Sequence, residues 1–245
     1  MPQNIYDNSV FFEHYKKLRE DEFGLNNLIE QPTIYSLLPE VKNKSILDIG
    51  CGFGNFCRYV RSQGAAAVLG VDPSTNMLTI AKQLTDDPFI TFQQAPIETF
   101  NHTPESFDVI VSSAALHYIE DFSSVVKKIV SWLKPQGTFI FSVEHPICTS
   151  YSTMIVEKDQ HGEKFYPIYN YRDEKMYEQS WYGESVIKYH RTLSTYMNTL
   201  LDHSLTIAKV MEPMPTDEFL KKYPKLTSNK IRPPLLVIKS IKNTI

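Results

Sequence analysis

The stretch that decides the fold reads Leu47-Asp48-Ile49-Gly50-Cys51-Gly52-Phe53-Gly54-Asn55. Three of the chain's 9 glycines fall here, although its 245 residues hold only about half the ~7% glycine of an average protein. Glycine adopts backbone conformations that other residues avoid, and it lets a ligand approach the main chain closely. The apolar run before the cluster predicts a buried strand that ends in a ligand-binding turn and opens a helix.

Other short apolar runs follow this first strand at 45–49. They lie at 67–72, 89–92, 107–112, 138–143, 205–211 and 235–241. Most are apolar on both faces, as strands buried in a parallel sheet are. The segment 122–133 has apolar residues at helical spacing and ends at the breaker pair in 134–137. Repeated strand–helix units predict an α/β fold with a Rossmann-like, doubly wound, mostly parallel sheet of seven strands.

A chain of 245 residues fits one large domain. We expect four parts: an N-terminal helical cap at 1–44, a ligand-binding core at 45–144, a substrate lid and helix at 145–204, and the last two strands at 205–245. The cap is expected to break at Pro32 and Pro39. Many aromatic residues and a weak periodicity in 145–190 indicate an aromatic lid inserted over the sheet.

The composition excludes several classes of protein. Lys+Arg is 25 and Asp+Glu is 28, a net charge of −3, which disfavours a large surface for DNA or RNA. Three cysteines are too few and too scattered for a disulfide framework or a zinc site. The N-terminus has no apolar signal core, and no run approaches the ~20 apolar residues of a membrane span. We therefore expect a cytoplasmic protein with no membrane partner.

The spacing of the glycines excludes two phosphate-binding turns. A dinucleotide-binding turn requires G-x-G-x-x-G, but Asn55 stands where the third glycine belongs. A phosphate-binding loop requires G-x-x-x-x-G-K-[ST], and no such string occurs. A nicotinamide-dependent dehydrogenase is accordingly the weakest interpretation.

The sequence instead resembles the class I S-adenosylmethionine-dependent methyltransferases. Their first motif places an acidic residue two positions before G-x-G-x-G, as Asp48, Gly50, Gly52 and Gly54 do. Asp72 closes the second strand, where the family's acidic residue holds the ribose hydroxyls. A carboxylate at that point can accept hydrogen bonds from both hydroxyls. The resemblance implies S-adenosylmethionine (SAM) as cofactor and S-adenosylhomocysteine (SAH) as product.

The resemblance also implies further cofactor contacts. Gln94 departs from the family pattern, which has an aspartate that accepts from the adenine amino group. The cap and the tail resemble those of a bacterial small-molecule methyltransferase subgroup. Besides the motif residues above, the implied cofactor-binding residues are Tyr15, Arg19, Cys51, Pro73, Met77, Gln94, Ala95, Pro96, Ser112, Ser113 and Leu116.

Methyl transfer from a sulfonium is an in-line displacement that needs alignment and the exclusion of water rather than a metal. A hydroxyl or protonated amine acceptor also needs a base, and a histidine suits that role. His117, His145 and His190 are the candidates, and no metal site is predicted. Candidate substrate-binding residues are Glu144, Trp181, Tyr182 and Tyr189.

A small-molecule acceptor with an O or N nucleophile is the leading interpretation, and the oligomeric state stays open. Two alternatives remain. The first is methylation of tRNA or protein through the basic tail, which comprises Lys221, Lys222, Lys225, Lys230 and Arg232. The second is a non-catalytic, cofactor-binding regulatory subunit.

Overall fold

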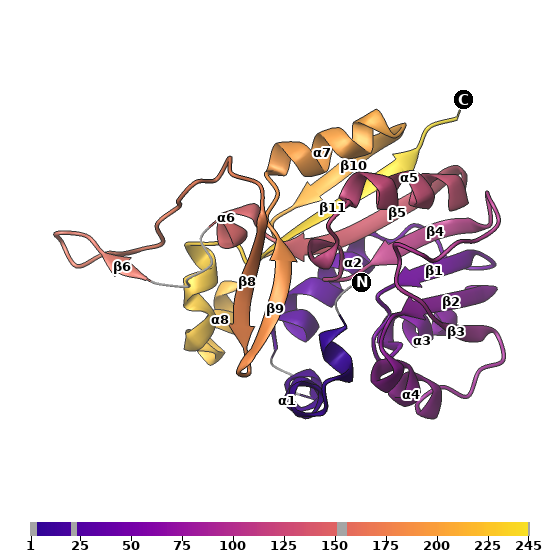
Figure 1. The fold of residues 1–245 in the computed structure, drawn as a ribbon, viewed down its shortest axis with the longest axis horizontal. Helices are drawn as coiled ribbons and strands as arrows, with labels where there is room; N and C mark the ends of the chain where they lie inside the picture. The colour runs from indigo at the N-terminus through magenta and orange to yellow at the C-terminus, as the bar shows by residue number, and fades with distance from the viewer. Residues whose placement is uncertain (1–3, 21–23, 151–155, 245) are drawn as a thin grey trace.

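The computed structural model describes residues 4–20, 24–150 and 156–244. A seven-stranded sheet with the order β10-β11-β5-β4-β1-β2-β3 forms its centre (Figure 1). Neighbouring strands are parallel except where β11 pairs with β5 and with β10. The predicted Rossmann-like, mostly parallel sheet is confirmed. Its strands are β1 (Ser45–Ile49), β2 (Ala67–Asp72), β3 (Ile90–Gln94), β4 (Phe107–Ser112), β5 (Leu133–Glu144), β10 (Leu205–Met211) and β11 (Leu235–Lys242).

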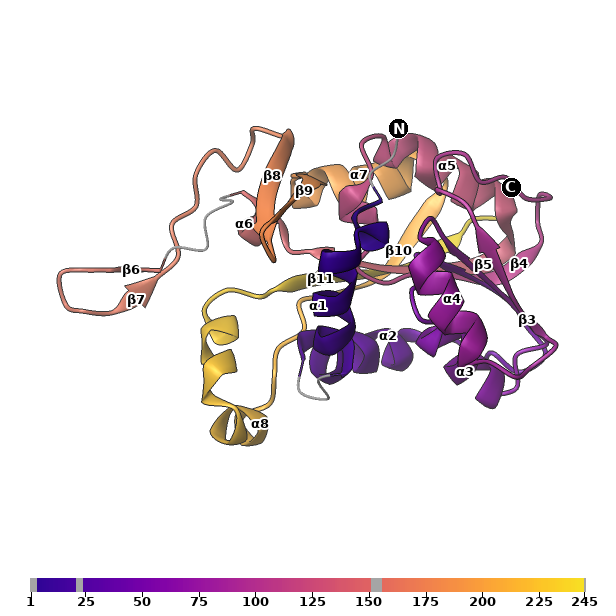
Figure 2. The ribbon, with the colours of Figure 1, turned by 60° about the horizontal axis from the view of Figure 1, so that its bottom comes forward.

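Helices cover both faces of the sheet, as Figure 2 shows. One apolar core lies under α2 and α3, where Ile34 and Val60 are fully or almost fully buried. The other lies under α5 and α7, where Ile129 and Leu200 are buried. The helices are η1 (Ile5–Asp7), α1 (Ser9–Glu20), η2 (Asn26–Glu30), α2 (Gln31–Leu37), α3 (Asn55–Ser62), α4 (Thr75–Gln83), η3 (Leu116–Tyr118), α5 (Phe122–Trp132), α6 (Pro146–Thr149), α7 (Leu193–Asp202), α8 (Asp217–Lys222) and η4 (Pro224–Lys230).

The register of the central strands sets the position of the ligand-binding edge. Ile49, the last residue of β1, pairs with Val71 on β2 and with Ser112 on β4. The three strands therefore end at the same level, and the loops that follow them meet. The order of the strands reverses between β1 and β4, which is where open α/β sheets bind ligands.

Three boundaries differ from the sequence predictions. The predicted break at Pro32 is wrong, because η2 is a π-helix that runs directly into α2. Pro32 lies in the first turn of α2, where a residue without an N–H costs the helix nothing. Strand β3 begins one residue later than predicted and extends to Gln94. Strand β5 already begins at Leu133, and the expected breaker 134–137 appears as an irregularity in its register with β4.

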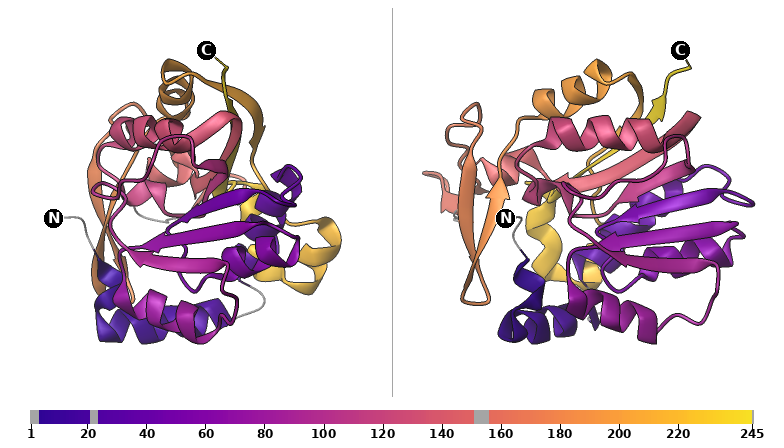
Figure 3. Two further views of the ribbon diagram at one scale, coloured as in Figure 1. Left: turned by 90° about the vertical axis from the view of Figure 1, so that its right-hand side faces the viewer. Right: turned by 45° about the vertical axis from the view of Figure 1, so that its right-hand side comes forward.

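The segment after β5 contains two antiparallel ribbons that the sequence did not predict. The first pairs β6 (Glu157–Lys158) with β7 (Lys164–Phe165), and the second pairs β8 (Met176–Trp181) with β9 (Glu184–Tyr189). Tyr182 and Gly183 close the second ribbon with φ of 52° and 81°, as a tight hairpin turn requires. Figure 3 shows this hairpin in front of the ligand-binding edge, beside the N-terminal segment. The predicted insertion also includes residues 151–155, which lie outside the described part of the chain.

Candidate active site

A cavity lies at the carboxyl ends of β1, β2 and β4 and is closed by the N-terminal helices. Its lining includes most of the residues predicted to bind the cofactor. These are Tyr15, Arg19, Asp48, Gly50, Cys51, Gly52, Asp72, Pro73, Met77, Ala95, Pro96, Ser113 and Leu116.

Three predicted cofactor residues, Gly54, Gln94 and Ser112, do not line the cavity but contact the loops and strands around it. Gly54 is the N-cap of α3, and a Cβ there would lie 2.7 Å from the Phe92 ring. The Gln94 amide donates to the Pro73 carbonyl at 3.1 Å and to Thr75 Oγ1 at 2.7 Å. Ser112 Oγ donates to the Ile49 carbonyl at 3.0 Å. These contacts hold the loops at the strand ends and give the three residues a structural role.

The first two glycines of the motif meet different demands. Both have positive φ, 73° at Gly50 and 50° at Gly52. A Cβ on Gly50 would lie 2.6 Å from the Cβ of Ala115, so packing within the protein requires glycine there. A Cβ on Gly52 would meet nothing within 4 Å, although Gly52 lines the cavity. The space over Gly52 is therefore a cradle that a ligand can fill.

Two buried carboxylates face this space. Asp72 accepts the backbone N–H groups of Gly52 and Ser74, each at 2.9 Å. Asp48 is 2% exposed and accepts the Cys57 thiol at 3.3 Å. Burial raises the pKa of Asp48 to about 7 and that of Asp72 to about 6. Among the described residues, neither carboxylate forms an ion pair with a basic side chain.

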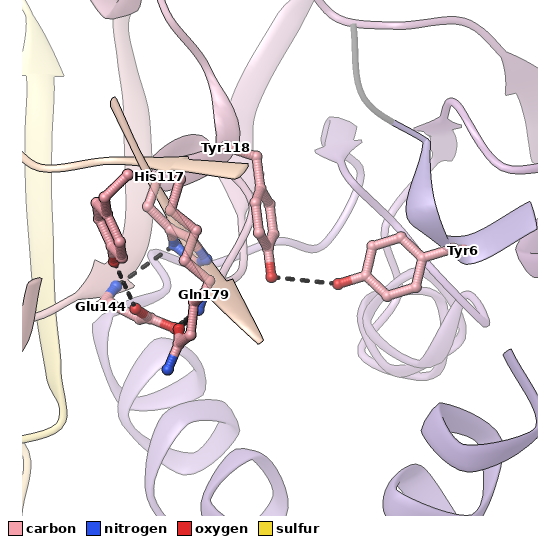
Figure 4. A network of polar contacts seen from close by, with 7 residues as sticks. Tyr6, His117, Tyr118, Glu144 and Gln179 are labelled. Atoms are coloured by element: carbon pink, nitrogen blue, oxygen red, sulfur yellow. Dashed lines mark hydrogen bonds and ion pairs between the residues drawn. The ribbon is translucent and has the colours of Figure 1, made fainter. Parts of the chain in front are cut away.

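Another part of the cavity lining is aromatic. The rings of Tyr6, Tyr15 and Tyr118 line it, and the hydroxyls of Tyr6 and Tyr118 lie 3.4 Å apart (Figure 4). Burial raises the pKa of Tyr6 and Tyr118, so both phenols stay neutral. Aromatic faces attract cations such as a sulfonium. Together with the carboxylates, the lining fits a ligand with hydroxyl donors, an apolar face and positive charge, which are the features of SAM.

The pKa values of the two carboxylates predict how SAM affinity depends on pH. A bound cation favours ionised Asp48 and Asp72, whose pKa values of about 7 and about 6 leave them partly protonated in the free protein. Binding must therefore release protons, and affinity is expected to rise from about pH 5 to about pH 8, by up to about tenfold per pH unit for each proton. Calorimetric titrations in buffers of different ionisation enthalpy measure both quantities, and an affinity that stays constant over this range would contradict the prediction.

The free protein should show the opposite trend in stability. The folded-state pKa values lie above the ordinary value of 3.8, so the folded state retains protons that the unfolded state has lost. The contribution of these two groups to stability is therefore complete below about pH 4 and falls as the pH rises towards 7.

The N-terminal segment is fastened across the cavity by Asp7. Its carboxylate accepts the Ser74 hydroxyl at 2.6 Å and the backbone N–H groups of Thr75 at 3.3 Å and Asn76 at 3.1 Å. These are the free donors at the start of α4, where a negative charge is stabilised. The cap places Tyr6 against the cavity.

The structure gives His145 and His190 other partners. His145 Nδ1 accepts the Ile147 N–H at 3.1 Å, and its Nε2 lies 2.9 Å from Glu212 Oε1. His190 Nδ1 lies 2.7 Å from the Thr149 hydroxyl, and its Nε2 lies 2.8 Å from the Tyr171 carbonyl. Neither ring lines the cavity, and both ring nitrogens of each are engaged. These contacts speak against a general-base role for either residue.

His117 lies between two residues that line the cavity, Leu116 and Tyr118. The ring is 2% exposed, and burial lowers its pKa to about 4. Its Nδ1 accepts the Glu144 N–H at 3.4 Å (Figure 4). The ring is therefore neutral near pH 7 and a weak base.

Glu144 belongs to the polar network of Figure 4. Its carboxylate forms an ion pair with buried Lys188 and accepts the Tyr177 hydroxyl at 3.4 Å. Burial acts to raise the pKa of Glu144, but the Lys188 ammonium and the hydrogen bonds from Lys188 and Tyr177 hold it below its ordinary value. Glu144 is thus a stable anion on the side of the site that faces β8 and β9.

The aromatic residues predicted to contact substrate separate into two groups. Trp181 packs edge-on against Phe11 and Tyr15, with ring centroids 5.3 and 5.9 Å apart. Tyr182 stacks on His14 at 5.0 Å in the hairpin turn and is 38% exposed. Tyr189 lies next to the Arg191 guanidinium, whose Cζ is 5.7 Å from the ring centre, and does not line the cavity. Trp181 thereby touches Tyr15, a residue of the cofactor cavity.

Sequence reasoning did not assign roles to Glu30, Tyr118 and Lys188. Glu30 is 2% exposed and accepts the Ser113 hydroxyl at 2.7 Å, together with that of Ser142. Glu30 lies in the N-terminal cap, which resembles that of a methyltransferase subgroup, but this resemblance gives Glu30 no role. Lys188 is buried in a strand that was not predicted, so no signal in the sequence marked it.

Comparisons with known proteins agree with this architecture. A family model described as a methyltransferase domain matches residues 47–141. An S-adenosylmethionine-dependent methyltransferase from Mesorhizobium loti is 36% identical, with a TM-score of 0.83 over 87% of this chain and 97% of that one. A Listeria monocytogenes structure assigned to the same kind of enzyme is 41% identical, with a TM-score of 0.82 over 88% of this chain and 97% of that one.

A curated relative, malonyl-[acyl-carrier protein] O-methyltransferase from Halalkalibacterium halodurans, is 35% identical over 57% of this chain and 56% of that protein. The match thus spans about half of this relative. The fold, the cavity and the two full-length matches place the protein in a class of nucleoside-binding α/β enzymes. The chain belongs to the S-adenosylmethionine-dependent methyltransferases.

Two further observations apply to the described residues. None of their helices combines the length and the apolar character needed to cross a bilayer. No group of three or more His, Cys, Asp or Glu side chains in them is placed to hold a metal ion.

Proposed function

We propose that this enzyme binds SAM in the cavity at β1, β2 and β4 and transfers its methyl group to a small-molecule acceptor with an oxygen or nitrogen nucleophile. The proposal rests on the cover over the cavity, called the roof below, which the β8–β9 hairpin and α1 form together. Trp181 of the β8–β9 hairpin contacts Phe11 and Tyr15 of α1. A roof built from two distant segments admits a small molecule more readily than the surface of a folded RNA or protein.

The basic tail supports a macromolecular acceptor less well. Lys230 forms an ion pair with Asp217, and the Arg232 guanidinium lies 4.1 Å over the Tyr166 ring. Lys230 is therefore paired within the protein and Arg232 lies against an aromatic ring, so the two cations do not form one open basic surface. Relatives are named both O-methyltransferases and N-methyltransferases, so the proposal keeps both nucleophiles.

The residues of the chain bind, orient and shield. Bound SAM supplies an electrophilic methyl group whose transfer removes a positive charge. The Asp72 carboxylate is placed to accept hydroxyl donors, and Met77, 3% exposed, offers an apolar face beside it. The rings of Tyr6, Tyr15 and Tyr118 favour binding of the cationic cofactor. Alignment of the methyl group with the acceptor and exclusion of water by the roof then lower the barrier to transfer.

The test is a screen for SAH release. The purified protein is incubated with SAM and with phenols, carboxylic acids and amines, and bulk tRNA and a protein extract form separate arms. Mass spectrometry identifies both SAH and the methylated product. Turnover of a small acceptor supports the proposal, whereas methylation confined to the tRNA or protein arm would replace it with the macromolecular alternative.

His145→Gln and His190→Gln are expected to change stability and not turnover. Each removes hydrogen bonds of a buried ring, so the free energy of unfolding should fall by about 1–3 kcal/mol. Because neither ring lines the cavity, kcat on the acceptor from the screen should stay within about threefold of wild type, against an effect of about 100-fold or more for loss of a general base. Denaturant unfolding and steady-state kinetics separate the two effects. A loss of kcat of that size in a folded variant would restore the histidine as the base.

A further inference from the structure

A second cavity lies beside the first, at the carboxyl end of β5 and the start of β11. Five distant segments line it, and they contribute Leu25 before η2, Glu144 at the end of β5, Tyr166 after β7, Tyr177 and Gln179 on β8, and Asn229 and Arg232 in and after η4. The cofactor contacts described above do not use it. Glu144 connects it to the polar network near Tyr118 (Figure 4).

The negative charge in this cavity is already neutralised. Lys188 forms an ion pair with Glu144 and also donates to Gln179 Oε1 at 2.7 Å. Because the ammonium only donates, it fixes the amide oxygen of Gln179 on its own side. The Gln179 NH₂ group is thereby left as a donor, and it makes no hydrogen bond within the described residues.

Arg232 is the remaining charge. Its guanidinium stacks on the Tyr166 ring with 4.1 Å between Cζ and the ring centre. Within the described residues it forms no ion pair and donates no hydrogen bond, so its planar set of N–H donors is available. The contact with the ring restrains the guanidinium, whose planar donors suit bidentate recognition of an acidic group.

We propose that this second cavity binds the acidic group, a carboxylate or a phosphate monoester, of the methyl acceptor. Arg232 is its charge partner, and the amides of Gln179 and Asn229 are further donors. The phenol of Tyr177 and the ring of Tyr166 supply apolar surface for the rest of the molecule. The inference rests on the proposed function, because it assigns this cavity to the acceptor.

Ligand-observed ¹⁹F relaxation tests the proposal without methyl transfer. The probes are 4-fluorobenzoate, 4-fluorophenyl phosphate and the neutral 4-fluorobenzamide, with SAH at saturation so that Arg19 in the first cavity is covered. At least one acid is expected to bind about tenfold more tightly than the amide. The stronger of the two acids shows whether the cavity prefers a carboxylate or a phosphate.

Variants locate the binding. Arg232→Gln should remove the preference for acids, and Arg232→Lys, which keeps the charge without the planar donors, should retain part of it. Arg172→Gln is the matched control, because Arg172 is exposed and lines neither cavity. Unchanged SAH affinity verifies that each variant is folded.

Three results would overturn the proposal: equal binding of acids and amide, an acid preference that survives Arg232→Gln, or no binding of any probe. The proposed function fails separately. If acids bind through Arg232 but no small acceptor is methylated, the anion site stands and the methyl transfer to a small molecule does not. If neutral acceptors are methylated and acids bind no more tightly than the amide, methyl transfer to a small molecule stands and the anion site does not.

Discussion

Replacement of Gly52 by alanine is expected to weaken SAH binding at least about 100-fold, or about 2.8 kcal/mol, while the protein stays folded. The added methyl group meets no protein atom within 4 Å, but Gly52 lines the cofactor cavity. The methyl group would therefore occupy space that the ligand needs. The φ of 50° at this position costs alanine about 1–2 kcal/mol of stability, which a folded domain tolerates.

Two other alanine substitutions serve as controls. Gly162→Ala carries similar backbone strain, with φ of 82° and open space around the new Cβ, but Gly162 lies in the β6–β7 turn. It should lose similar stability and no affinity. Gly50→Ala forces its Cβ to 2.6 Å from Ala115, so overpacking of about 1–3 kcal/mol adds to the strain and this variant should be the least stable of the three.

Calorimetry with SAH and denaturant unfolding compare the three variants with wild type. Undiminished affinity in Gly52→Ala would show that the ligand does not occupy the space over Gly52. Equal stability of Gly50→Ala and Gly162→Ala would contradict the packing argument.

Asp72→Asn is expected to weaken SAM binding by about 100-fold, since hydrogen bonds to a charged group contribute about 1.5–3 kcal/mol each. The asparagine keeps one acceptor oxygen and turns an NH₂ group towards the N–H of Gly52 or Ser74, which the carboxylate bonds at 2.9 Å. The variant loses the charge that a cationic ligand requires and one acceptor for its hydroxyls.

The same substitution should not destabilise the free protein much. The folded-state pKa of Asp72 is about 6, above the ordinary 3.8, so at pH values above 6 the ionised group opposes folding. A neutral side chain removes that cost and offsets the lost hydrogen bond. Asp202→Asn, exposed at the end of α7, is the control for charge. Calorimetry measures the SAM affinity of Asp72→Asn, and thermal unfolding measures its stability. An affinity within threefold of wild type would contradict the assignment of Asp72 to cofactor binding.

The strands of the central sheet and the cofactor motif were predictable because both follow local patterns in the chain. Apolar runs of five or six residues reveal buried strands, and parallel pairing then brings their carboxyl ends together. Asp48 lies in β1, Gly52 follows β1 and Asp72 ends β2. The pairing of two strands that end at one level is therefore enough to bring them together. Proline was a less informative cue, since Pro32 lies in the first turn of α2 and does not break the helix.

The acceptor side was not predictable in the same way. The side chains of Glu144, Lys188 and Arg232 come from a strand end, a hairpin and a loop that are far apart in sequence. The hairpin turn at Tyr182-Gly183 lacks the usual Asn-Gly signal, so β8 and β9 were missed. His145 follows β5 and His190 follows β9, and active-site residues often stand at the ends of strands. The hydrogen-bond partners of both rings come from other parts of the chain, and only folding brings them together.

The sequence by itself determined the sheet, the glycine turn and the position of the acidic residues, because each depends on short-range pattern and on the regular pairing of strands. In the sequence, Gly50, Gly52 and Gly54 form one motif, and all three are predicted to bind the cofactor. Only the tertiary structure separated them, since Ala115 and Phe92 approach Gly50 and Gly54 while the space over Gly52 is open. The same holds for charge: whether a carboxylate or a guanidinium is neutralised depends on neighbours that folding brings within a few ångströms, and no local pattern records them.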